Sequence, residues 1–434
     1  MKKKIFSLTL ALLLVVGILP VGFAQSEPVL KLAAIETAYG ADMWKEIVAA
    51  FEEANPEVKV ELIIDKNLED VISPSMKAGD FPDVIHLATG RPAALTDTFI
   101  KDNAIEEISD VLLMNVPGEE ITVGEKIIPG FLDTAMTNPY GDGKTYLAPA
   151  FYGPCGLFYN AGLFTEKGWD LPETWEDMWA LAEEAAKEEI ALFAYPTTGY
   201  FDAFFYALMF EVGGVEFFEK ATHYEEGIWE TDEAKSAFDI VGKLASYTHV
   251  SVPSNANNEN FLKNQQLILD NKALFMPNGS WVIGEMAEAP RAEGFEWGFM
   301  ALPAIEKGGD HYSYTFYEQH WIPAGAENKE LAKEFIAFLY SDKAVEIFAK
   351  AGAVQPIVDV ADKLEGDMKL YYSIYDEGAK PAMGLFATTD PVEGVELGAV
   401  WWEPVNSLVS GDKTQEEWVQ GIIQASDKLR EALK

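Results

Sequence analysis

Short apolar runs alternate with helical patterns in the first ninety residues. Residues 30–35 and 83–87 are apolar runs typical of buried strands, and residues 58–64 alternate between apolar and polar side chains. Residues 43–51 carry apolar side chains at helical spacing, and Pro56 favours an end to this helix just before it. The order strand, helix, strand, connection, strand predicts a parallel sheet with right-handed crossovers.

The remainder of the chain predicts further α/β segments. Thr174, followed by Asp177 three residues later, is typical of a helix N-terminus. No later segment is apolar enough to span a bilayer. In open α/β sheets the ligand sits at the carboxyl ends of the strands, which puts residues 36–41 and 89–91 on one rim. Strands are expected at residues 145–150, 157–160, 273–276 and 320–323, and helices at residues 174–186, 331–339 and 418–429.

The N-terminus predicts an exported protein. Three lysines, an apolar run over residues 5–19 and the small-residue end Gly22-Phe23-Ala24 are typical of a cleaved signal peptide over residues 1–24. A membrane anchor is the competing interpretation, but the run is shorter than the roughly 20 residues a spanning helix needs. No cysteine lies near the cleavage site, so a lipid anchor is not available, and we expect a periplasmic protein.

Composition and charge exclude further classes of protein. The chain has 434 residues, 49% of them hydrophobic, which excludes disorder and predicts two domains. There are 32 Lys and Arg against 71 Asp and Glu, a net charge of −39, and loss of three lysines with the signal peptide makes it −42. Such an acidic chain is not expected to bind nucleic acid. The single Cys155 excludes an internal disulfide and is expected to be a buried hydrophobe.

Catalytic and cofactor motifs are mostly absent. Residues 138–145 end in Gly-Lys-Thr but lack the first glycine of a phosphate loop, and Ser280 misses the Gly-x-Ser-x-Gly elbow. The five histidines lack zinc spacing, and no dinucleotide fingerprint occurs, so no metal and no cofactor are expected. A secreted glycoside hydrolase stays open as an alternative, although no particular pair of acids stands out by its spacing.

Four stretches, taken in order, resemble the extracellular solute-binding proteins of carbohydrate ABC importers, the maltose-binding-protein-like group. They are residues 44–60, 79–85, 143–178 and 273–281, the last closing in Asn-Gly-Ser-Trp, and residues 328–335 are similar to the late helix of the family. The resemblance covers essentially the whole chain after the signal peptide. It implies a periplasmic-binding-protein-like α/β fold with two lobes, a hinge and a ligand cleft between the lobes.

The same resemblance implies a division of the chain and its partners. Lobe 1 would comprise residues 25–151 and 303–352, and lobe 2 residues 152–302 and 353–434. The protein would be a monomer and no enzyme. It would capture a sugar, which we expect to be an oligosaccharide, and deliver it to the membrane permease of the importer. The same fold with a non-sugar solute such as a polyamine stays open as an alternative.

Sugar chemistry and the resemblance together indicate the candidate contacts. Aromatic rings cover the C–H faces of a pyranose, and carboxylates, amides and arginine take its hydroxyls. Trp281, after an Asn-Gly turn, is the best candidate for stacking. For the others, core packing or a solvated loop stays open, and only one of the two C-terminal tryptophans could face a cleft. Gly90 and Gly153 stand where maltose-binding relatives carry acids, which weakens the case for maltodextrin. The complete set is Trp281, Tyr200, Phe201, Asp202, Trp401, Trp402, Arg91, Glu36, Tyr39 and Glu318, with His320 considered beside them.

Overall fold

The computed structural model describes residues 28–37, 39–91, 93–132, 134–257, 259–387 and 389–433. The predicted signal peptide, residues 1–24, lies outside the described residues. Within them, one nine-stranded sheet has the order β2-β1-β3-β8-β4-β6-β5, with β7 on β4 and β9 on β8. The strands are β1 (Val29–Ile35), β2 (Lys59–Asp65), β3 (Val84–His86), β4 (Leu147–Asn160), β5 (Ala191–Phe193), β6 (Ala273–Gly279), β7 (Trp297–Met300), β8 (Tyr312–Trp321) and β9 (Lys380–Ala382).

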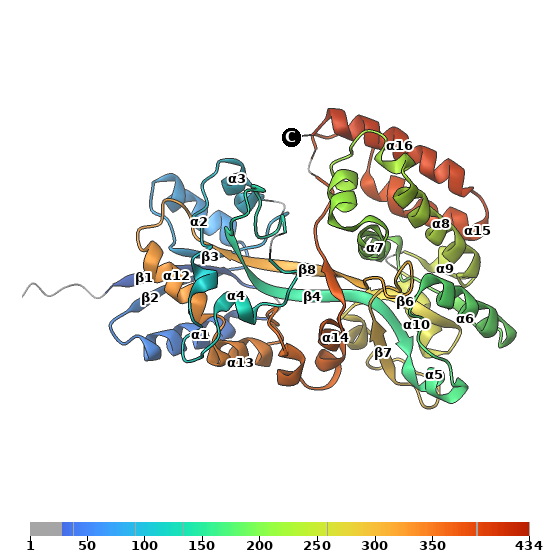
Figure 1. The fold of residues 1–434 in the computed structure, drawn as a ribbon, viewed down its shortest axis with the longest axis horizontal. Coiled ribbons are helices and arrows are strands. Elements are labelled where there is room, and N and C mark those ends of the chain that lie inside the picture. The colour runs from blue at the N-terminus through green and yellow to red at the C-terminus, as the bar shows by residue number, and fades with distance from the viewer. Residues whose placement is uncertain are drawn as a thin grey trace, which may run out of the picture.

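The first lobe is built around the parallel strands β1, β2 and β3, as the hydrophobic pattern predicts. Helices cover both faces of these strands, with α2 and α3 on one side and α1 and α13 on the other (Figure 1). Trp44 of α1 packs against Phe348 of α13, whereas Leu68 of α2 belongs to a separate apolar cluster with Ile35. The helices are α1 (Ala41–Ala54), α2 (Leu68–Lys77), α3 (Leu95–Lys101), α4 (Val123–Lys126), α12 (Lys329–Phe338) and α13 (Asp342–Lys350).

The second lobe surrounds β5 and β6, which are parallel to each other. Thr174 and Asp177 form the predicted capping box at the start of α6. Gly214, with φ of 65°, kinks the long aromatic helix α7. The helices are α5 (Ala161–Lys167), α6 (Trp175–Lys187), α7 (Phe201–Thr222), α8 (Asp232–Tyr247), α9 (Val252–Asn255), α10 (Phe261–Leu269), α11 (Val282–Glu285), α14 (Gly366–Asp376), α15 (Pro404–Ser410) and α16 (Gln415–Glu431).

Two long antiparallel strands, β4 and β8, run from one lobe into the other (Figure 1). The expected strands 145–150 and 157–160 are therefore joined into one, and the expected strand 320–323 is the end of a longer strand that begins at Tyr312. Pairing of β4 with β8 on both sides of the junction keeps the two strands extended through it. Their register shifts between Pro149 and Tyr152, which marks an irregularity where the lobes meet.

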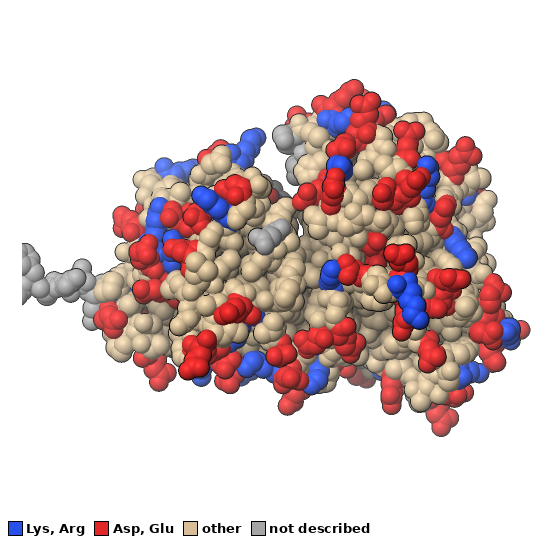
Figure 2. Space-filling model, viewed as in Figure 1, with Lys and Arg blue, Asp and Glu red and all other residues tan. Residues whose placement is uncertain are grey.

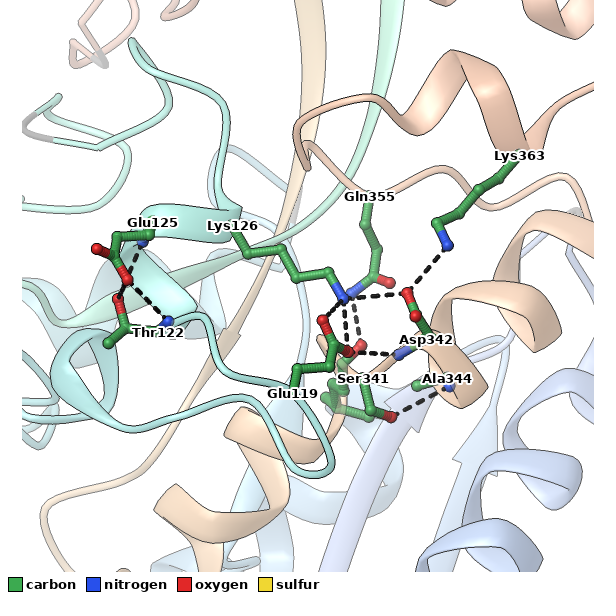
Figure 3. Close-up of polar contacts among 10 residues, drawn as sticks. Glu119, Thr122, Glu125, Lys126, Ser341, Asp342, Ala344, Gln355 and Lys363 are labelled. Atoms are coloured by element: carbon green, nitrogen blue, oxygen red, sulfur yellow. Dashed lines mark hydrogen bonds and ion pairs between the residues drawn. The ribbon is translucent and has the colours of Figure 1, made fainter.

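A third connection between the lobes, which includes Val354 and Val358, passes beside this junction. The backbone N–H of Tyr152 donates to the carbonyl of Val354 at 3.0 Å. The buried Lys126 bonds to this connection through its backbone carbonyl, and its side chain joins two acids of the first lobe (Figure 3). Lys126 Nζ lies 2.6 Å from Glu119 Oε2 and 3.2 Å from Asp342 Oδ1, while its carbonyl accepts from the N–H of Val358 at 2.9 Å. The division into lobes, with a boundary near residue 352, stays a prediction.

The surface of both lobes is strongly acidic. Figure 2 shows Asp and Glu side chains scattered over this face of the molecule, with fewer Lys and Arg between them. Among the described residues, no helix combines the length and apolar character needed to cross a membrane. The acidic groups therefore form a solvated coat over the fold.

Candidate ligand-binding site

Three aromatic side chains meet where the second lobe faces the junction. Tyr200 stands at the start of α7 and Trp281 directly after β6, with ring centroids 5.7 Å apart. Phe316 of β8 lies 5.9 Å from Trp281 and is 48% exposed. The segments that carry Tyr200 and Trp281 both follow the carboxyl ends of parallel strands, the usual ligand edge of such a sheet. We call Tyr200, Trp281 and Phe316 the aromatic platform.

Two glycines shape the space around the platform. A Cβ on Gly279 would collide with the indole of Trp281, so only glycine lets the ring fold back over the end of β6. Gly153 of β4 is paired with Phe316, and a Cβ on it would meet no atom within 4 Å. Open space therefore lies beside Phe316, where an acid of the maltose-binding pattern would stand.

Asp202 adds a carboxylate close to the platform. It lies in the first turn of α7, two residues after Tyr200, where a negative charge suits the helix dipole. Burial raises the pKa of Asp202 to about 6, and burial, followed by the charge of Asp202, raises the pKa of the Cys155 thiol. A half-buried carboxyl group near partly exposed rings can accept hydroxyl hydrogen bonds from a bound sugar.

A second set of polar side chains lies on the first lobe and on β8. Glu318 of β8 is 25% exposed, and its Oε2 lies 2.9 Å from His86 Nε2. Tyr39 packs on Phe151, with ring centroids 5.5 Å apart, and burial followed by the charge of Glu318 raises its pKa. Glu36 follows β1, is half-buried, and donates its backbone N–H to Asp65. Glu36, Tyr39 and Glu318 thus lie at or near the predicted rim.

Four predicted contacts have other partners in the structure. Arg91 forms two hydrogen bonds with Glu69, at 3.1 and 3.0 Å, which commit its guanidinium to the first lobe. Three aromatic residues lie in the core of the second lobe instead of on an exposed face, because the dense aromatic clusters of this lobe surround them. These are Phe201 against Phe204, Trp401 against Phe386, and Trp402 against Phe205, with exposures of 1%, 0% and 7%. Their packing does not support ligand contact.

Phe316 is a platform residue that the sequence analysis missed. The alternating aromatic residues Tyr312, Tyr314 and Phe316 place three rings on one face of β8. The first two pack under α7, with Tyr312 on Phe210 and Tyr314 on Tyr206, and only Phe316 stays exposed. The alternation was the available signal, but nothing in the local pattern distinguishes the exposed ring from the covered ones.

A separate cavity of about 520 Å³ lies between the loop of residues 129–136 and the second half of α7. Its walls are mainly apolar and include Phe210, Phe218 and Leu385. None of the predicted site residues lines it. Among the described residues there is also no cluster of three His, Cys, Asp or Glu side chains suited to a metal ion.

A two-lobed α/β protein with an aromatic platform where its lobes meet has the architecture of a solute receptor. The chain belongs to the bacterial extracellular solute-binding protein family, whose sequence pattern matches residues 46–370. It is 22% identical to the diacetylchitobiose binding protein NgcE of Streptomyces coelicolor over 95% of this chain and 87% of that protein. It is also 22% identical to the maltotriose-binding protein of Pyrococcus abyssi, over 80% of this chain and 69% of the relative.

Solved structures share the fold. The bacterial solute receptor AcbH, described as preferring β-D-galactopyranose, superposes with a TM-score of 0.71 at 17% identity, over 93% of this chain and 99% of that one. RafE from Streptococcus pneumoniae gives a TM-score of 0.64 at 18% identity, with the same coverage. The expected α/β, periplasmic-binding-protein-like fold is confirmed, and the relatives are binding proteins.

Proposed function

We propose that this protein is the substrate-binding component of an ABC importer and captures a sugar between its lobes. The aromatic platform carries the proposal, since Trp281 and Phe316 offer ring faces to the C–H faces of a pyranose. Asp202, Glu318 and Glu36 supply acceptors for the hydroxyl groups. Relatives whose names include diacetylchitobiose and maltotriose support an oligosaccharide as the ligand.

The transport role follows from the same proposal. Ligand contacts to both lobes favour the closed form, and the closed form delivers the sugar to the membrane permease. We place the lobes at residues 25–151 with 303–352 and at residues 152–302 with 353–434, and we expect a monomer. The protein would be exported by its signal peptide to the periplasm and would leave the sugar chemically unchanged.

Truncation of the central ring tests the proposal. Trp281→Ala should lower sugar affinity by about 10- to 100-fold, as expected for loss of a buried aromatic contact. The measurement is isothermal titration with chito-oligosaccharides, malto-oligosaccharides and galactose. Trp179→Ala is the matched control, because Trp179 packs on Tyr247 of α8, outside the platform. Equal affinity of Trp281→Ala and wild type would contradict the proposed stacking.

The same titrations separate the alternatives. A receptor returns the sugar intact after incubation, whereas a glycoside hydrolase releases new reducing ends. Binding of spermidine but of no sugar would point to a polyamine receptor with the same fold. Either of these results would replace the proposed function.

A further inference from the structure

Three side chains form a line from the core of the first lobe to the proposed site. His320 Nδ1 lies 3.3 Å from His86 Nδ1, and His86 Nε2 lies 2.9 Å from Glu318 Oε2. His86 of β3 and His320 of β8 are directly paired across the two strands. Glu318 precedes His320 by two residues and shares its face of β8. The exposed fraction increases along this line, from 0% for His320 and 1% for His86 to 25% for the Glu318 side chain.

The partners determine where the protons sit. A carboxylate only accepts, so His86 Nε2 must donate to Glu318. In a neutral His86 the other nitrogen, Nδ1, is then an acceptor, and His320 Nδ1 must donate to it. This leaves His320 Nε2 as a bare acceptor, and that atom is buried without a hydrogen-bond partner among the described residues. Burial holds the pKa of His320 well below its usual range, in agreement with a neutral His320 ring.

Aromatic packing fixes both imidazole rings. Trp44 of α1 lies 5.0 Å from His86 and 5.9 Å from His320, measured between ring centroids. Phe151 of β4 lies 5.1 Å from His86 and 6.2 Å from His320. Since rings from two other elements enclose the pair, neither imidazole can rotate without disturbing the core.

We propose that His86 is a positioning residue, which holds Glu318 Oε2 so that Oε1 is presented to a hydrogen-bond donor of the bound sugar. Within the described residues Oε1 accepts no hydrogen bond, and the carboxylate is partly exposed beside Tyr39. The matching ligand group is a hydroxyl or an acetamido N–H, because a carboxylate oxygen offers only an acceptor. The inference rests on the proposed function, since it assigns Glu318 to the sugar.

Two amide substitutions separate positioning from packing. His86→Gln and His86→Asn both remove the ring, but only the Gln amide nitrogen reaches the position of Nε2 and can donate to Glu318. We expect His86→Gln to bind the best sugar within about twofold of wild type. We expect His86→Asn and Glu318→Gln each to lose roughly tenfold in affinity, as for one charge-assisted hydrogen bond. The double variant His86→Asn/Glu318→Gln should lose little more than either single variant.

The readouts distinguish the two levels of the argument. Equal losses of affinity in His86→Gln and His86→Asn would show that His86 has only a packing role. Normal binding by Glu318→Gln would show that Glu318 does not contact the sugar. Either result overturns this inference but leaves the proposed function in place. No binding of any sugar by wild type would overturn the proposed function and the inference with it. Nitrogen NMR of wild-type protein with labelled histidines needs no variant, so it tests the inference even if the variants fail to fold. It should show a protonated His86 Nε2, and an unprotonated Nε2 would overturn the inference.

Discussion

Glu211 is a half-buried acid whose removal should stabilise the protein. It lies on α7 just before the kink, and one carboxyl oxygen accepts from the N–H of Tyr312 at 2.6 Å. Burial, with a smaller contribution from the charge of Asp310, raises its pKa from 4.5 to about 9. The folded protein therefore carries Glu211 protonated at neutral pH, whereas the unfolded chain carries it ionised.

The sign of the pH dependence follows from this difference. A group with a raised pKa contributes its full stability below 4.5 and loses it as the pH rises toward 9. Each pH unit above 4.5 costs about 1.4 kcal/mol, so the penalty is about 1 kcal/mol at pH 5 and at most about 4 to 5 kcal/mol at pH 8. Glu211→Gln keeps an acceptor for Tyr312 and has no proton to take up.

Urea denaturation at the two pH values measures this effect. The gain in unfolding free energy of Glu211→Gln should grow by at most about 3 to 4 kcal/mol from pH 5 to pH 8. Glu216→Gln is the control on the same helix, because Glu216 is 82% exposed and pairs with the nearby Lys220 at 2.7 Å. The control should change stability by less than about 0.5 kcal/mol at either pH. An equal effect of Glu211→Gln at both pH values would refute the titration argument.

Two further predictions concern the hinge and the site. Lys126→Met leaves Glu119 and Asp342 without their shared cation, and we expect a loss of about 1 to 2 kcal/mol in urea denaturation, moderated by the exposure of Asp342. A loss within 0.3 kcal/mol of zero, about the error of such measurements, would show that the cluster does not stabilise the fold. The raised pKa of Asp202, about 6, predicts that sugar affinity rises between pH 5 and pH 7.5 as the carboxylate forms. Asp202→Asn should abolish that rise in titrations at both pH values, and a persisting rise would exclude Asp202 as its source.

Local patterns predicted the regular elements well. The strand–helix–strand order correctly predicted the parallel pairing of β1, β2 and β3, and the Thr174–Asp177 pair correctly predicted the start of α6. These features depend on side-chain spacing over a few residues, which the sequence displays directly. Pairing over long distances is different, since the continuity of β4 depends on β8, more than 150 residues later.

Which aromatic residues are buried and which lie at the surface could be predicted from the sequence only in part. Trp281 lies on the platform, whereas Trp401 and Trp402 are enclosed by the rings of Trp229, Phe205 and Phe386. A tryptophan has the same local signature whether it fills a core or faces a ligand. The distinction arises from tertiary packing, as the exposed Phe316 beside the covered Tyr314 also demonstrates.

The acidic surface and the proposed ligand are consistent with each other. An anionic solute would meet the carboxylates of Asp202, Glu318 and Glu36, and Arg91 cannot compensate without giving up Glu69. A cationic solute would be attracted by these acids and by ring faces, but it has no broad C–H face to stack on the rings of the platform. A neutral sugar uses the rings and the acceptors together and is indifferent to a net charge of −39. In this proposal the net charge keeps the protein solvated, and the placement of a few rings and carboxylates would select its ligand.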